Sequence, residues 1–152
     1  MRAVRLLAVL VPAVMFAKGP QVTVEDTGST NSPGLRVMFD RDGHATVEPR
    51  GAETQHITLP EPLCKRLLQD VEAAGPVNEL PAVHCIKSVS FGSRTFVEFN
   101  GNRSPDLSCP AGDDPRSRTL RKDANDILLA AREAANIPSS GRVFTVPAPH
   151  SH

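Results

Sequence analysis

Hydrophobic and polar residues alternate along residues 35–39, so one face of an extended chain there is apolar. The dipeptide Asp42-Gly43 follows and is typical of a type I′ hairpin turn, because it supplies two positions of positive φ. The chain then returns through residues 45–47, which alternate in the same way. This pattern predicts a β-hairpin, with shorter strands at residues 21–25 and 55–59.

A second stretch with strand-like composition covers residues 86–99 and ends at Asn100-Gly101. Asn-Gly between two extended segments is a strong hairpin signal. A two-residue loop places Glu98 opposite Arg103, and opposite charges at facing positions stabilise a pair of strands. The sequence therefore predicts a second hairpin.

A segment with helical periodicity follows the first hairpin. Thr58 and Glu61 have the spacing of a capping box, and Gly75-Pro76 is a strong stop signal. The apolar residues between them recur at helical intervals. They are Leu63, Leu67, Leu68, Val71 and Ala74.

The second hairpin is also followed by an amphipathic segment. Asp114 is the expected N-cap, Pro115 suits the first helical position, and Asn136 with Pro138 ends the helix. One face of this segment is continuously apolar. The face consists of Leu120, Ala124, Ile127, Leu128, Ala131 and Ala135.

These elements predict an α+β fold: an antiparallel sheet of about four to five strands built from two hairpins, with two amphipathic helices on one face. The plan of hairpin followed by helix occurs twice, which suggests a duplication. One hairpin is not stable alone, but several strands and two helices bury a shared core.

The first residues resemble an export signal. Arg2 and Arg5 precede an apolar run at residues 6–16, and Ala17 is a small residue at a cleavage point. No later segment has the length of a membrane span. The sequence predicts a cleavable signal peptide at residues 1–17, one domain at residues 18–138 and a loose tail at residues 139–152.

Charge and aromatic content argue against nucleic-acid binding. The chain has 17 Lys and Arg residues and 17 Asp and Glu residues, and loss of the signal leaves a net charge of −2. Binding to phosphates requires clustered basic residues. The chain has no Trp or Tyr, the residues that often stack on bases.

Three cysteines imply one disulfide and one remaining thiol in an oxidising compartment. Spacing alone leaves all pairings open. We favour Cys85 with Cys109, because both flank the second hairpin. A strict two-residue turn places Cys109 opposite Gly92, so this bridge requires a bend in the chain, which Gly92 permits. Cys64, in the first helix, is then a buried thiol.

The tetrapeptide Asp26-Thr27-Gly28-Ser29 resembles the active-site loop of the aspartic peptidases. In that family two such loops share a proton between their carboxylates. The resemblance implies a small homodimeric hydrolase that uses Asp26. The other interpretation is a polar loop that leaves a strand.

No set of residues predicts a cofactor or a built metal site. Asp40 and Asp42 resemble the start of a calcium loop, but the downstream acidic ligands are absent. His84, with His150 and His152 in the tail, offers weak metal binding as an alternative function.

The sequence as a whole favours a non-catalytic binding module exported to the bacterial envelope or medium, with another exported protein as partner. Its oligomeric state and specific ligand stay open. The binding residues expected are polar side chains of two loops and one exposed aromatic ring. These are Thr27, Ser29, Thr30, Asn31, Phe96 and Asp106.

Overall fold

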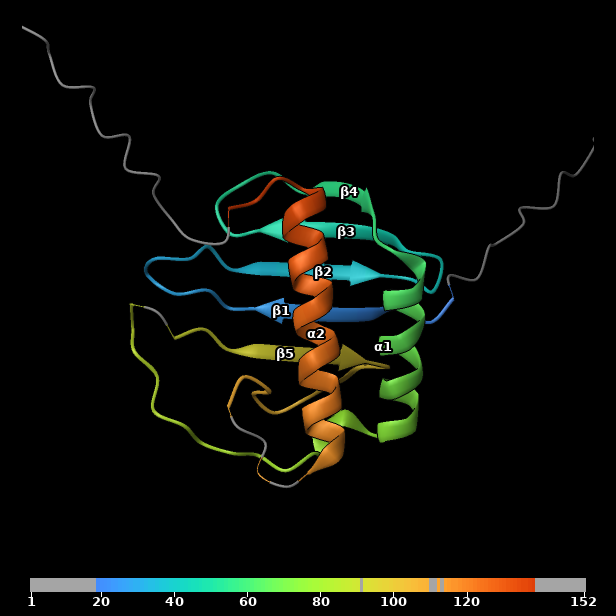
Figure 1. Ribbon diagram of the computed structural model, residues 1–152, viewed down its shortest axis with the longest axis vertical. Coiled ribbons are helices and arrows are strands. Elements are labelled where there is room, and N and C mark those ends of the chain that lie inside the picture. The colour runs from blue at the N-terminus through green and yellow to red at the C-terminus, as the bar shows by residue number, and fades with distance from the viewer. Residues whose placement is uncertain (1–18, 91, 110–111, 113, 139–152) are drawn as a thin grey trace, which may run out of the picture.

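The computed structural model describes residues 19–90, 92–109, 112 and 114–138. The predicted signal peptide and C-terminal tail therefore lie outside the described residues. The described chain forms an α+β fold in which a six-stranded antiparallel sheet carries two helices on one face (Figure 1). The fold class is confirmed, and the sheet has six strands where the sequence predicts four to five.

The sheet has the strand order β4-β3-β2-β1-β5-β6. Strands β1 to β4 form a meander, and β5 pairs with the other edge of β1. The strands are β1 (Val22–Asp26), β2 (Leu35–Phe39), β3 (His44–Pro49), β4 (Gln55–Thr58), β5 (Thr95–Phe99) and β6 (Asn102–Arg103). Of the described residues in the predicted extended stretch at residues 86–99, only those of β5 form a strand.

The two glycine turns differ in geometry. Asn100 and Gly101 both have positive φ, at 50° and 79°, and Glu98 faces Arg103, as predicted for a type I′ turn. In the first hairpin only Gly43 has positive φ, so the predicted type I′ geometry of Asp42-Gly43 is wrong.

Two contacts explain the different first turn. The Asp40 carboxylate accepts the backbone N–H groups of Asp42 and His44, which closes a wider turn. The Gly43 carbonyl accepts the N–H of Leu59, and a Cβ on Gly43 would lie 2.4 Å from the Leu59 oxygen. The turn is therefore shaped by the chain that leads into the first helix.

The helices α1 (Glu61–Ala74) and α2 (Pro115–Ala134) cover the same face of the sheet, and α2 crosses the strands (Figure 1). A short 3-10 helix, η1 (Val77–Glu79), follows α1. The predicted apolar faces enter the core, with Leu63 only partly buried. The core is therefore a single layer between the helices and alternate residues of the strands.

The helix starts differ in their capping. Asp114 accepts the N–H of Ser117 and caps α2, as predicted. The predicted capping box of α1 is wrong, because Pro60 is its N-cap and Thr58 belongs to β4. Glu61 instead forms an ion pair with Lys65 one turn later.

Candidate functional site

Residues 81–90 form an irregular segment between η1 and β5 that leaves the body of the protein, and we call it the braced segment. It is the yellow-green part of the chain that bows outward below β5 in Figure 1. Three separate sets of contacts hold it: a disulfide, a half-buried ion pair and backbone hydrogen bonds to the loop after β1.

The disulfide joins Cys85 to Cys109, with 5.6 Å between their Cα atoms, and confirms the favoured pairing. The required bend is present, because the N–H of Gly92 donates to the carbonyl of Ser88 over 2.6 Å. A Cβ on Gly92 would lie 2.5 Å from the Cβ of Lys87, so the bend is too close for a side chain. The disulfide thus ties the braced segment to the chain that follows β6.

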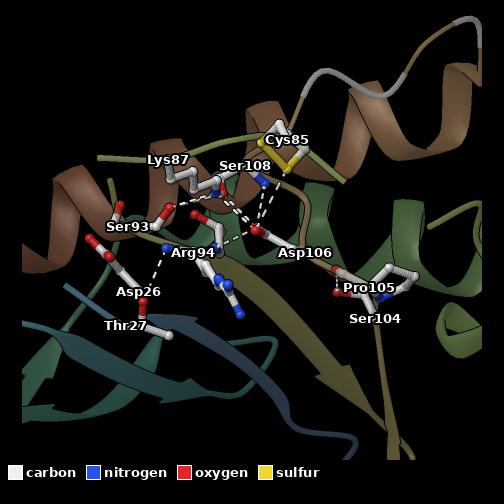
Figure 2. Close-up of polar contacts among 12 residues, drawn as sticks. Asp26, Thr27, Cys85, Lys87, Ser93, Arg94, Ser104, Pro105, Asp106 and Ser108 are labelled. Carbon is white, nitrogen blue, oxygen red and sulfur yellow. Dashed lines mark hydrogen bonds and ion pairs between the residues drawn. A yellow bond between two sulfur atoms is a disulfide. The ribbon is translucent and has the colours of Figure 1, made fainter. Parts of the chain in front are cut away.

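The second brace is the Lys87 ammonium, which points back into the protein (Figure 2). It lies 2.8 Å from the Asp106 carboxylate and donates to the Ser93 carbonyl and the Ser108 hydroxyl. Asp106 also accepts the N–H of Thr95, the first residue of β5. The Lys87 and Asp106 side chains are each less than one-fifth exposed, so this ion pair is shielded from water.

The pKa of Asp106 reflects its contacts with Lys87 and Ser108. Burial alone would raise it, but the hydrogen bonds from Lys87 and Ser108, with the backbone donors, lower the pKa below its ordinary value. Asp106 is therefore ionised at neutral pH and serves as an internal anchor.

The third brace comes from the loop after β1. The backbone N–H groups of Thr30 and Asn31 donate to the carbonyls of Val89 and Ser90, each over 3.3 Å. The Thr30 hydroxyl also donates to Val89. This loop is therefore a support for the braced segment.

The same loop contains Thr27 and Ser29, which make contacts inside the protein. Thr27 exchanges two hydrogen bonds with the backbone of Arg94, over 2.9 and 3.0 Å. The N–H of Ser29 donates to Ser32 within the loop. Only Thr30 and Asn31 of the predicted loop residues are exposed.

The outer face of the braced segment is exposed. Burial alternates along it, with Cys85 and Lys87 half-buried and His84, Ile86 and Ser88 exposed. Ile86 is fully exposed, and Val89 is 83% exposed. Sequence analysis did not single out the apolar side chains of Ile86 and Val89. It predicts a strand here, and the alternation of a strand does not show which side of an irregular segment faces water.

A groove of about 340 Å³ lies between the braced segment and the sheet. Phe96 and Asp106, two of the predicted binding residues, line it beside His84 and Arg94. Phe96 lies on the sheet face opposite the helices, where the Arg103 guanidinium sits 4.0 Å from its ring centre. Phe96 is thus partly covered.

The carboxylate of Asp26 is occupied by contacts within the chain. One oxygen accepts the N–H of Gly28 over 2.9 Å, and the other lies 3.0 Å from the Arg132 guanidinium of α2. Arg132 also donates to the carbonyl of Pro33 and is almost fully buried. Asp26 thus joins α2 to the loop after β1, a contact that sequence analysis missed.

Acidic and histidine side chains meet at the first hairpin turn. Ligand atoms of Asp40, Asp42 and His44 lie within 4.8 Å of one another, but Asp40 already binds His44 and the turn backbone. His84 lies on the braced segment, and the tail histidines of the alternative metal hypothesis lie outside the described residues.

Comparisons of the chain with protein-family models, curated proteins and solved structures gave no match. Neither helix of the described residues has the length and apolar character needed to cross a membrane. The disulfide is typical of proteins that fold in an oxidising compartment.

Proposed function

We propose that this protein is a non-catalytic binding module, exported to the bacterial periplasm or medium, whose contact surface is the braced segment. The observation that supports it is the exposure of Ile86 on a segment held in place on both sides of that residue. The partner is another exported protein.

The physical argument concerns entropy. Ordering a free loop on binding costs about 0.5–1.5 kcal/mol for each immobilised side chain, and a pre-ordered loop avoids much of that cost. Cys85 and Lys87 are already fixed by the fold. An exposed aliphatic side chain between them gains free energy when a partner removes it from water.

The experiment is capture of partners from the exported fraction of the host on the immobilised protein. We expect a stoichiometric partner on the wild type and its loss with Ile86→Asp. Leu129→Asp is the matched control, because Leu129 is also exposed, at 63%, but lies on α2. Equal capture by all three proteins would refute the proposed surface, and no partner on the wild type would refute the binding function.

A further inference from the structure

We infer that the partner of the braced segment is an endopeptidase, and that the segment occupies its active-site cleft as a substrate-like inhibitor; this inference rests on the proposed function. A peptidase cleft takes its substrate as an extended strand and pairs with its backbone. Among the described residues, none forms a hydrogen bond with the backbone of residues 82–87. Those donors and acceptors are therefore available to an enzyme.

The side chains of the segment are arranged as such a cleft requires. Ile86 projects fully into solvent, while its neighbours Cys85 and Lys87 turn toward the protein. Val89 is also exposed, at 83%, but Ile86 is the apolar side chain that lies between the two braced residues. The specificity pocket of an endopeptidase accepts one such projecting side chain. Because this side chain is aliphatic, the matching enzyme has an apolar pocket that accepts small aliphatic groups.

The braces explain why the segment inhibits rather than being consumed. Hydrolysis of the Ile86–Lys87 peptide bond adds one water and yields a carboxylate on Ile86 and an amine on Lys87. The disulfide holds Cys85, and Asp106 holds Lys87, so both new ends stay next to each other in the cleft. Retained ends favour resynthesis of the bond and slow the release of the enzyme.

The test is inhibition of pancreatic elastase, an endopeptidase with a small apolar pocket, by the purified protein. We expect stoichiometric inhibition by the wild type and by Leu129→Asp. We expect an inhibition constant about 100-fold higher for Ile86→Asp, as for loss of a central contact residue. The variant Ile86→Lys is expected to lose elastase and gain trypsin as its target.

A second variant tests the braces. In the double variant Cys85→Ala, Cys109→Ala, we expect inhibition to be transient, with rapid cleavage after Ile86 detected by mass spectrometry. Circular dichroism confirms that each variant is folded. Absence of elastase inhibition by the wild type would overturn the inference, and so would trypsin inhibition by the wild type, since it would make Lys87 the inserted residue.

Failure of this inference is separable from failure of the proposed function. If Ile86→Asp abolishes capture of an exported partner while neither peptidase is inhibited, the binding function stands and the inhibitor assignment falls. If capture also fails, both fall.

Discussion

Asp106 is the residue on which the geometry of the braced segment most depends, because it bonds Lys87, Thr95 and Ser108 together. In Asp106→Asn the amide oxygen keeps the backbone contacts but the ion pair with Lys87 is lost. We expect the free energy of unfolding to fall by about 1–2 kcal/mol. Urea denaturation measures this loss, with the exposed Asp42→Asn as the control.

The same variant separates local from global effects. The backbone amides of Thr30, Asn31 and Gly92 donate to carbonyls of the braced segment, so their hydrogen exchange is expected to become faster in Asp106→Asn while exchange in β1 and β2 changes little. Unchanged exchange at these three amides would contradict the anchoring by Asp106.

Asp26 and Arg132 form the other residue-level contact, between the end of β1 and α2. Asp26→Asn leaves a buried guanidinium without its counter-charge, so we expect a loss of about 2 kcal/mol in the free energy of unfolding. Arg132→Met combined with Asp26→Asn is expected to recover part of that loss, because both charges are then removed. A double-mutant cycle by chemical denaturation measures the coupling, and additive losses would contradict it.

At the scale of elements, α1 and α2 meet at a buried acid. Asp123 of α2 is 3% exposed and lies 2.8 Å from Arg66 of α1. Burial, and then the hydrogen bond with Asp70, raises the pKa of Asp123 to about 6 although Arg66 opposes the shift. One Asp123 oxygen is buried and receives no hydrogen bond from a described donor, so the hydrogen bond between Asp123 and Asp70 forms only when one of the two acids carries a proton.

This raised pKa gives a prediction for stability against pH. Between about pH 4 and 6 the folded state holds a proton on Asp123 that the unfolded state releases, so the free energy of unfolding decreases as pH rises through this window. The pKa values of Asp40, Asp106 and Asp126 are lowered, so their contributions are lost only at more acidic pH. Denaturation at intervals of half a pH unit measures the slope.

The control is Asp70→Asn, which removes the neighbouring acid and supplies an amide donor in its place. We expect the decrease in stability between pH 4 and 6 to become smaller in this variant, since ionised Asp123 then has a partner. A slope equal to that of the wild type would show that Asp70 does not set the pKa of Asp123.

How far the sequence predicts each element depends on how local its cause is. Asn100-Gly101 has the predicted turn because both φ values are set within the dipeptide. Asp42-Gly43 differs because Leu59, beyond β4, bonds to the turn. The helix face that contains Leu120 follows from periodicity alone.

The candidate site is less predictable for the same reason. The positions of the three cysteines favour the pairing of Cys85 with Cys109. The sequence also shows that Asp106 is a polar residue in a loop. The inward turn of Lys87 and the outward turn of Ile86 depend on a bend at Gly92 and on contacts with Thr30, from another part of the chain. Alternation in sequence does not encode these contacts, so the exposed apolar residues were missed.

At the scale of the whole molecule, the disulfide joins the half-buried Cys85 to the buried Cys109, and neither belongs to the hydrophobic core cluster. The free thiol Cys64 lies within that cluster and is fully buried. The bridge joins residues separated by 24 positions, so its removal increases the conformational entropy of the unfolded chain. We expect the double variant Cys85→Ala, Cys109→Ala to keep the sheet and helices but to lose about 3 kcal/mol in the free energy of unfolding.

The labelling rate of the Cys64 thiol measures this loss of stability. Burial is the main cause that raises its pKa to about 11, so the thiol reacts with a disulfide reagent at pH 8 only when the protein opens. If opening and closing are fast relative to labelling, the labelling rate follows the population of the open state. A loss of about 3 kcal/mol then raises the rate by about 150-fold in the double variant. A rate equal to that of the wild type would mean that the disulfide constrains the braced segment alone and leaves the stability of the core unchanged.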